Sequence, residues 1–357
     1  MIIRKLVLRN FRSYDSVDLI FDKGLSVILG ENAEGKTNIV EAIHYLSLAR
    51  SFRTAEDADL IKEQKSFAAI DAEVLEGNIK KKINVVITNS GKKISCNLKS
   101  INRLSELSEL INVVVFEPPS VALFKESPKA RRDFLDISLS KQSTVYLEYI
   151  TKYERVLRER NELLKSDKPN ATQLEIVTDL LIDIAEKVIR YREMYVEQIN
   201  KVLSKIVTSI KGEKENARIR YQPFVRPDGA YKTNAKSAFS KALDGDLKKK
   251  VTSIGPHRED FKMSLNGKDV AKYGSQGENR ILALALTLSP YFLIEDKDKR
   301  PIVVLDDVMS ELDDENKERL ISFLTKFEQV FITSTSLEVE NAAIYEVKNH
   351  KIARRNS

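Results

Sequence analysis

The stretch Gly30-Glu31-Asn32-Ala33-Glu34-Gly35-Lys36-Thr37 decides the fold of this chain. It follows the pattern Gly-x-x-x-x-Gly-Lys-Ser/Thr of a phosphate-binding loop at every position. Residues 25–29, directly before it, are apolar enough for a short buried strand, and residues 38–49 carry apolar side chains at helical spacing. A strand, this loop and a helix, in that order, are the setting in which the pattern binds a nucleoside triphosphate.

Two residues of the loop have predictable roles. Lys36 is expected to reach the β- and γ-phosphates, and the Thr37 hydroxyl is expected to ligate Mg²⁺. The glycines let consecutive backbone N–H groups point at the phosphates, and the positive end of the following helix adds to the attraction. The loop therefore predicts a nucleotide and a metal, but it does not say how the triphosphate is used.

Composition sets only broad limits. The 357 residues have room for two or three domains, and 42% hydrophobic residues can fill a sizeable core. The single cysteine, Cys96, excludes an internal disulfide and is typical of a reducing cytosol. The longest apolar stretch, residues 281–288, is too short to span a membrane, so a cytoplasmic protein without a membrane partner is expected. A net charge of +6 is compatible with DNA as a partner without requiring it.

The two ends of the chain have the patterns of one α/β head. Alternating residues near the start predict antiparallel strands, and apolar runs with turn residues between them predict the rest. The expected strands are residues 3–8, 17–21, 68–75, 82–88, 93–98, 112–116, 261–265, 301–305, 330–333, 344–347 and 351–353. Residues 281–288 and 315–327 are expected to be helices, and the first of these should be buried because it is apolar on nearly every side.

The middle of the chain has a different character. No glycine occurs between residues 140 and 211, and apolar residues recur at helical spacing on both sides of a polar break at residues 165–170. Two long helices joined by a hairpin turn would form a projecting coiled-coil arm; an ordinary all-α insertion is the alternative. Residues 221–252 look irregular and polar. The expected domains are therefore a head from residues 1–139 and 251–357, and a helical arm or lid from residues 140–250.

A second nucleotide motif follows the strand at residues 301–305. A buried strand would carry the Asp306 carboxylate to the sheet edge beside Mg²⁺, and Asp307 next to it could orient or deprotonate the attacking water as the catalytic base. The alternative is that an acid after an apolar strand only caps a helix. The presence of the phosphate loop favours the nucleotide role.

Ser275-Gln276-Gly277, before the buried helix, could be a plain helix N-cap or an anion site. The order of phosphate loop, Ser-x-Gly signature and acid-tipped strand resembles the ABC-type ATPases, in which the signature closes in trans over the nucleotide of another subunit. By the same resemblance, Ser310 and Asp313 would lie in a loop at the dimer interface. Residues 335–336 stand where that class carries a switch histidine, and this chain has none there.

Across nearly its whole length the chain resembles the RecF family of recombination mediators. The stretches that match are residues 8–14, 30–38, 41–42, 50–53, 127–136, 255–260, 274–277 and 305–313. The chain departs from the family at residues 117–120, in a loop that resembles the one bearing a metal-contacting glutamine in relatives, and at Glu278 and Pro290. His257 and Arg258, in the stretch at residues 255–260, could contact a phosphate or interface, or could stabilise the connection between lobes.

The resemblance implies a fold and a function. The fold would be an ABC-type ATPase head, with a phosphate-loop sheet and an antiparallel β lobe, and an inserted helical arm. Two heads would enclose two ATP molecules with Mg²⁺ and clamp DNA at single-strand gaps without sequence preference. They would release it by slow, weak ATP hydrolysis that DNA stimulates. The family further implies action with RecR and RecO to load RecA in DNA repair, replication restart and the SOS response.

Two other functions remain open from the residues. An ABC transporter subunit would need a surface for a membrane partner and a switch histidine. A structural chromosome-maintenance head would need a much longer coiled coil than residues 140–211 allow.

Overall fold

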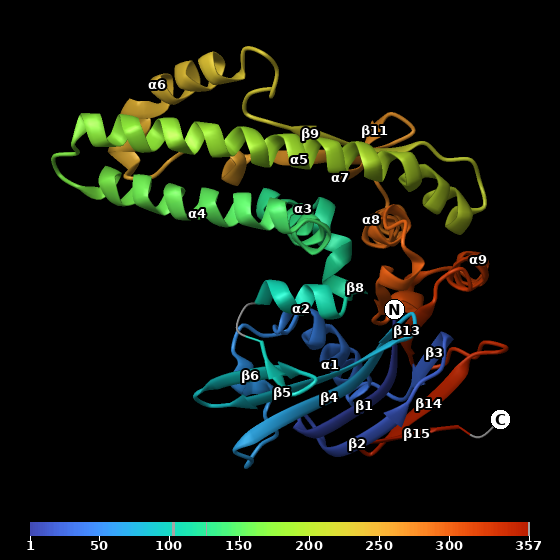
Figure 1. Cartoon of the computed structure of the whole chain (residues 1–357). Helices are drawn as coiled ribbons and strands as arrows, with labels where there is room; N and C mark the ends of the chain where they lie inside the picture. The colour runs from blue at the N-terminus through green and yellow to red at the C-terminus, as the bar shows by residue number, and fades with distance from the viewer. Residues whose placement is uncertain (102–103, 126, 356–357) are drawn as a thin grey trace. The chain divides into compact units, whose positions relative to one another are not determined.

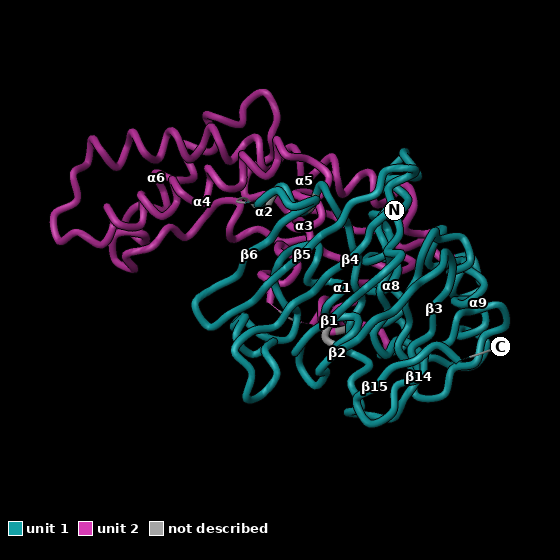
Figure 2. Tube along the Cα trace, turned by 60° about the horizontal axis from the view of Figure 1, so that its bottom comes forward, with its two compact units in different colours: residues 1–121, 205–214, 276–357 teal, residues 122–204, 215–275 magenta. Residues whose placement is uncertain are grey.

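The computed structural model describes residues 1–101, 104–125 and 127–355, which form two compact units (Figure 2). Unit 1 consists of Met1–Val121, Lys205–Lys214 and Gln276–Ser357. Unit 2 consists of Ala122–Ser204 and Glu215–Ser275. Each unit is therefore built from segments that are far apart in the sequence.

Unit 1 contains an antiparallel sheet near the start of the chain (Figure 1). Its strand order is β2-β1-β4-β5-β6-β7, and every neighbouring pair is antiparallel. The strands are β1 Ile2–Phe11, β2 Tyr14–Ile20, β4 Phe67–Glu76, β5 Ile79–Thr88, β6 Gly91–Cys96 and β7 Lys99–Ser100. The strands predicted from alternating residues in this part of the chain are confirmed.

The second sheet of unit 1 carries the nucleotide motifs. Its order is β15-β14-β3-β13-β12-β8, and all neighbours are parallel except the hairpin of β14 and β15. The strands are β3 Gly24–Leu29, β8 Val113–Phe116, β12 Ile302–Leu305, β13 Gln329–Ser334, β14 Ala343–Lys348 and β15 Lys351–Arg354. Because β3, β13, β12 and β8 are parallel, their carboxyl ends meet at one edge of the sheet.

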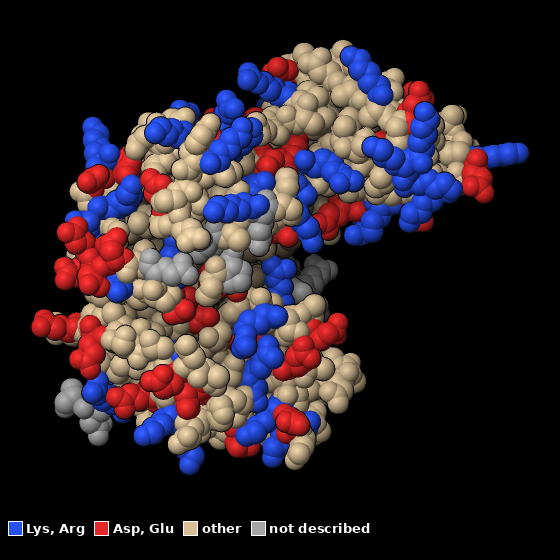
Figure 3. Space-filling view, turned by 180° about the vertical axis from the view of Figure 1, so that it is seen from behind, with Lys and Arg blue, Asp and Glu red and all other residues tan. Residues whose placement is uncertain are grey.

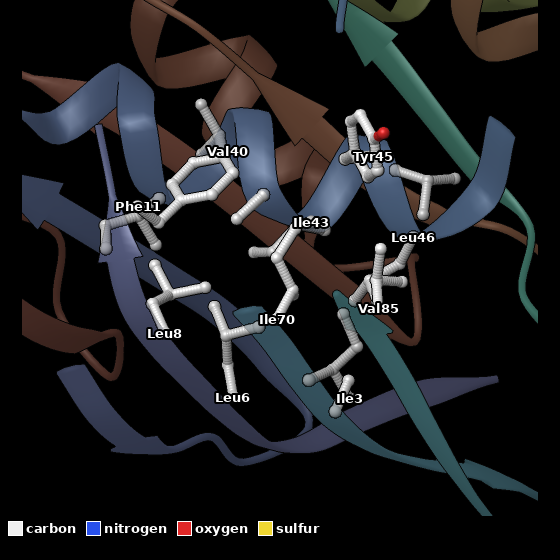
Figure 4. Close-up of a cluster of buried hydrophobic side chains, with 14 of the residues drawn as sticks. Ile3, Leu6, Leu8, Phe11, Val40, Ile43, Tyr45, Leu46, Ile70 and Val85 are labelled. Atoms are coloured by element: carbon white, nitrogen blue, oxygen red, sulfur yellow. The ribbon is translucent and has the colours of Figure 1, made fainter. Parts of the chain in front are cut away.

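Helix α1, Lys36–Leu48, packs between the two sheets. Its apolar side chains meet those of β1, β4 and β5 in the cluster of Figure 4, where Leu6, Ile43 and Ile70 are fully buried. Ile28 and Phe331 of the parallel sheet belong to the same core. Burying each such side chain contributes about 1.5–3 kcal/mol relative to leaving it in water. The helix after the phosphate loop is thus held on both faces.

The other elements of unit 1 are helices and short turns. The helices are α2 Leu104–Leu110, α8 Gln276–Leu293 and α9 Asp314–Leu324, and the 3-10 turns are η1 Asp57–Leu60, η4 Lys297–Lys299 and η5 Val308–Glu311. Helix α8 is buried from Asn279 to Tyr291, as its apolar composition predicted. Helix α9 ends at Leu324, three residues before the expected end.

Unit 2 consists of helices around a small antiparallel sheet of order β11-β10-β9. The helices are α3 Pro128–Gln142, α4 Thr144–Lys165, α5 Ala171–Lys211, α6 Tyr231–Lys249 and α7 Val270–Tyr273. The strands are β9 Ala217–Gln222, β10 Asp260–Leu265 and β11 Lys268–Asp269, and η3 Pro256–Arg258 is a 3-10 turn. The 3-10 turn η2, Pro118–Phe124, crosses the boundary between the units at Val121. The two long helices predicted on either side of residues 165–170 are α4 and α5.

Helix α6 corrects the expectation that residues 221–252 are irregular. Its buried apolar residues Tyr231, Ala235 and Phe239 form a stripe too narrow to stand out in a polar sequence. A buried ion pair holds it in place, since Arg160 of α4 donates to Asp246 at 2.8 Å and also to Thr252 at 2.8 Å. Removing one member of such a pair leaves a buried charge and typically costs about 3–5 kcal/mol.

The bounds of the units differ from the expected domains. Residues 122–139 and 251–275, expected in the head, group with the helical unit, and residues 205–214 group with unit 1. The reason is packing: α3 contacts both α4 and β10, which belong to unit 2. Among residues 1–101, 104–125 and 127–355, no helix combines the length and apolar composition needed to cross a membrane.

Candidate nucleotide site

The phosphate loop connects β3 to α1, and each of its two glycines has a steric reason. A Cβ atom at Gly30 would lie 2.6 Å from the Val347 carbonyl oxygen of β14. Gly35 has φ 110°, a left-handed conformation that side chains rarely adopt, and Tyr14 donates to its carbonyl at 3.1 Å. Between the glycines, the residues from Glu31 to Ala33 are exposed. The loop is therefore tightly packed at Gly30 and Gly35 and exposed to solvent between them, at residues 31–33.

Lys36 points into the loop. Its Nζ donates to the carbonyl of Gly30 at 2.6 Å and to that of Glu31 at 2.8 Å, and the residue is only 8% exposed. Burial lowers the pKa of Lys36, and the charges of Asp307 and Asp306 oppose that shift. Within the described part of the chain its hydrogen-bond partners are carbonyls rather than carboxylates. The phosphate oxygens of a nucleotide would supply the missing negative charge.

Thr37 and Asp306, the two predicted Mg²⁺ ligands, meet at the edge of the parallel sheet. The Thr37 hydroxyl donates to Asp306 Oδ1 at 3.1 Å, although the two residues are 269 positions apart. Adjacent oxygen ligands of an octahedral Mg²⁺ ion, at about 2.1 Å from the metal, lie about 3 Å apart. The donor set therefore fits Mg²⁺, with phosphate oxygens and water expected to complete the shell. No cluster of three or more acidic, histidine or cysteine ligands occurs among the described residues.

Thr333 was not predicted as a site residue, and it connects both acids. Its hydroxyl donates to Asp306 Oδ1 at 2.6 Å and accepts from the backbone N–H of Asp307 at 2.9 Å. Burial raises the pKa of Asp306, while the hydrogen bonds from Thr333 and Thr37 lower it. These hydrogen bonds thus favour the carboxylate form that a metal ion requires.

Glu117 begins the loop that departs from the family pattern. It follows β8, whose last residue Phe116 pairs with Leu305 just before Asp306. Burial, together with the charge of Asp306, raises the pKa of Glu117 to about 7. A second carboxyl group therefore lies at the edge of the sheet beside Asp306.

Asp307 has an exposed side chain on a constrained backbone. Its φ of 49° is left-handed, which costs a non-glycine residue on the order of 1 kcal/mol or more. Two contacts hold it there: the N–H donates to Thr333, and the carbonyl accepts from Arg280 Nη2 at 2.7 Å. Arg280 is a buried residue of α8 that sequence reasoning missed, because only the fold brings it to this loop.

A second set of residues, also not predicted from the sequence, stabilises helix α1, which follows the phosphate loop. Glu41 of α1 is fully buried and accepts from Arg12 at 2.6 and 2.9 Å. Arg53 donates to Asn38 at 2.9 Å and pairs with Glu41 at 3.4 Å. These residues occur in stretches that match the RecF family, which was the only signal for them in the sequence. Their contacts join the β1–β2 turn, α1 and the segment after it.

The remaining predicted residues are exposed. Ser275 and Gln276 precede or begin α8, and Gly277 lies in its first turn. Ser310 donates to the Asp307 carbonyl at 3.1 Å, and the Asp313 side chain caps α9 by accepting from Asn316 N–H at 2.8 Å. Thr335 and Ser336, after β13, are exposed too.

His257 has a structural environment in unit 2. Its Nε2 donates to the Thr252 carbonyl at 3.0 Å, so its Nδ1 is the acceptor for the Tyr153 hydroxyl at 2.7 Å. Burial lowers the pKa of His257 to about 4. The neutral imidazole therefore stabilises the fold locally, whereas Arg258 is exposed.

Known proteins resemble this chain over nearly its whole length. The family model described as RecF/RecN/SMC N terminal domain matches residues 2–355. The "DNA replication and repair protein RecF" of Halalkalibacterium halodurans is 36% identical over 99% of this chain and 100% of its own length. The chain belongs to the RecF family. RecF of Oceanobacillus iheyensis is 38% identical over 95% of this chain and 94% of its own length, and RecF of Bacillus subtilis is 35% identical over 99% and 100%.

Solved structures agree with the RecF assignment. The recombination mediator protein RecF-ATP of the RecFOR pathway has a TM-score of 0.89 and 32% identity, over 99% of this chain and 97% of that one. A Smc head domain from Pyrococcus furiosus has a TM-score of 0.61 at 18% identity, over 99% and 96%, which shows a shared fold. The predicted fold, an α/β ABC-type ATPase head, is confirmed.

Proposed function

We propose that this chain is an ATP-dependent, DNA-binding recombination mediator whose two copies close on DNA when each holds ATP. One observation supports the proposal: Lys36 lies in the loop and Thr37 donates to Asp306 at the end of β12, in a chain that matches RecF over its full length. The relatives are named for DNA replication and repair, and one solved relative is RecF-ATP.

The nucleotide half of the mechanism uses residues of one copy. Lys36 and the N–H groups of the loop would bind the β- and γ-phosphates, and Thr37 with Asp306 would hold Mg²⁺. When bound, Mg²⁺ neutralises charge on the phosphate oxygens and favours attack at the γ-phosphorus. The exposed Asp307 carboxylate would orient and deprotonate the attacking water. Its fixed backbone supports this role.

The second copy would complete the site. Ser275, Gln276 and Gly277 are exposed at the start of α8, an 18-residue helix whose amino end carries positive potential. They would bind, in trans, the γ-phosphate that the other copy holds, and Ser310 and Asp313 would lie at the dimer interface. ATP would therefore favour the dimer, and slow hydrolysis would release it.

DNA is the proposed macromolecular partner, at single-strand gaps and without sequence preference. Lys and Arg side chains gather where α4 and α6 end, and include the exposed Lys165, Lys168, Lys248 and Lys249 (Figure 3). Contacts of such residues with phosphates give affinity without reading bases. Action with RecR and RecO to load RecA, in repair, replication restart and the SOS response, is proposed from family membership alone.

Light scattering coupled to size-exclusion chromatography tests the proposal. Wild-type protein with ATP, Mg²⁺ and gapped duplex should elute as a dimer on DNA, and without ATP as a monomer. Lys36→Met should lose ATP binding and dimerisation together. Asp307→Asn should keep ATP bound and accumulate the dimer, because the nucleotide persists.

Three results would contradict the proposal. The first is no ATP-dependent dimer or DNA retention in the wild type. The second is intact nucleotide-dependent DNA binding in Lys36→Met. The third is faster ATP turnover in Asp307→Asn, which would remove Asp307 from the role of base.

A further inference from the structure

A groove of about 790 Å³ lies in unit 2 between α5 and the strands β9 and β10. Alternation along β9 buries Ile219 and Tyr221 and turns Arg218 and Arg220 to solvent. On β10, Lys262 is exposed and lies directly opposite Arg220 in the strand register. Like charges opposite each other on a sheet destabilise it, so this basic row has an energetic cost.

The opposite wall of the groove is acidic. Glu193 and Glu197 lie four residues apart on α5, at the spacing where like charges repel along a helix. Burial and the neighbouring Glu197 raise the pKa of Glu193. The facing strands β9 and β10 therefore contribute basic side chains and α5 acidic ones; the lining also includes Asp269 of β11, and Arg226, whose charge opposes the rise in the pKa of Glu193.

The two rows do not neutralise each other. Of the residues that the structure describes, none forms an ion pair within 4.0 Å with Arg218, Arg220, Lys262, Glu193 or Glu197, so the two rows are not paired with each other. Acids about two to four turns before Glu193 on the same helix are paired: Glu186 with Arg190 at 2.6 Å, Asp183 with Lys232 at 2.8 Å and Asp179 with Lys236 at 2.6 Å. The acids of α5 that line the groove thus differ from these three, which have basic partners.

The backbone edge of β9 is already occupied. The Asn200 side chain of α5 accepts from Ile219 N–H and donates to the Ile219 carbonyl, both at 2.8 Å. Ser204 does the same with Ala217, at 3.0 Å each way. A partner cannot add a strand here by main-chain pairing, so side chains must recognise it.

We propose that this groove binds an extended polypeptide segment of a partner protein in which acidic and basic side chains alternate. An extended chain projects successive side chains to opposite sides, so acids would face the sheet and bases would face α5. A nucleic acid strand would satisfy the basic row but be repelled by the two glutamates. This binding goes beyond the proposed function, because no residue of the nucleotide site takes part in it.

Fluorescence anisotropy with defined probes tests the proposal. The probe is a labelled dodecapeptide of alternating glutamate and lysine; the control peptide has the same composition in two blocks. The alternating peptide should bind about tenfold more tightly than the block peptide, a difference of about 1.4 kcal/mol in binding free energy. Both Arg220→Glu and Glu197→Lys should weaken its binding about tenfold. Lys241→Glu, an exposed basic residue of α6, should leave binding unchanged.

A labelled oligothymidylate separates the two classes of ligand. If nucleic acid occupies the groove, Arg220→Glu weakens and Glu197→Lys strengthens oligonucleotide binding, and the proposal is wrong. Equal affinity for the alternating and block peptides, or no saturable peptide binding, overturns it as well. Unfolding is not a confounding cause, because Arg220→Glu places an acid opposite Lys262 and should keep or raise the thermal unfolding temperature.

Discussion

The partly buried His257 makes the stability of unit 2 depend on pH in a way that can be calculated. Its pKa is about 4 in the folded protein, against about 6.5 in an unfolded chain. Between about pH 4 and pH 6.5, His257 therefore binds a proton more readily in the unfolded chain than in the folded protein. The stabilisation is complete above pH 6.5 and is lost as pH falls toward 4. Linkage between these two pKa values gives a loss of about 2 kcal/mol between pH 7 and pH 5.

The contacts of His257 explain why the neutral form is required. Nδ1 accepts from Tyr153 and Nε2 donates to Thr252, so a proton on Nδ1 would face a hydroxyl that now donates to it. His257→Gln is the matched variant, since an amide can donate and accept but does not titrate near these pH values. Urea unfolding followed by circular dichroism at pH 7, 6 and 5 measures the difference.

The expected result is a wild-type curve that falls more steeply with acid than that of His257→Gln, by about 2 kcal/mol at pH 5. His350→Gln, at an exposed histidine, should follow the wild type. Equal slopes for wild type and His257→Gln would refute the assignment of a partly buried neutral imidazole. They would also reopen a role for His257 at a phosphate or an interface.

Three further predictions concern the proposed site and DNA. The Cβ atom introduced by Gly30→Ala would meet the Val347 carbonyl, so this variant should lower the free energy of unfolding by about 1–3 kcal/mol. Gly229→Ala adds a Cβ atom in open space and should not lower it. Equal effects of the two variants would contradict the steric argument. Thr333→Val leaves the Asp307 N–H without its acceptor and raises the pKa of Asp306 further. Calorimetry should therefore show that the variant loses more affinity for ATP with Mg²⁺ at pH 6 than at pH 8. Unchanged affinity at pH 6 would count against this prediction. DNA affinity should fall with salt by about 0.9 logarithmic units per decade for each phosphate neutralised, and a slope near zero in anisotropy titrations would exclude a phosphate-dominated contact.

Short contiguous patterns account for the parts of the site that the sequence predicted. The phosphate loop and the acid after β12 each lie in one segment, so the chemistry and spacing of neighbouring residues reveal them. Thr333, Arg280 and Tyr14 act through contacts with residues that are distant along the chain. Only the fold brings such pairs together, and their residue types are ordinary where they occur.

Two parts of the fold differ from what the sequence predicted: helix α6 and the bounds of the two units. Strands and long helices with strong periodicity were predicted, but α6 was missed. Its apolar stripe is narrow, and a buried ion pair between Asp246 and Arg160 also anchors it. The unit bounds moved because α3 packs on α4 and β10, a tertiary preference that periodicity does not encode. The trans role of Ser275 and the interface role of Ser310 stay predictions.

The sheet that carries the phosphate loop has a consequence for biosynthesis. Strand β3 pairs on both sides with strands from the end of the chain, β13 and β14, and buried Gln329 hydrogen-bonds to Ile3 across 326 positions. Such pairing cannot form until the ribosome has released nearly the whole polypeptide. A truncated product therefore has the complete loop sequence but no sheet to position it. We therefore expect a chain cut before β13 to lose nucleotide binding although its loop sequence is intact.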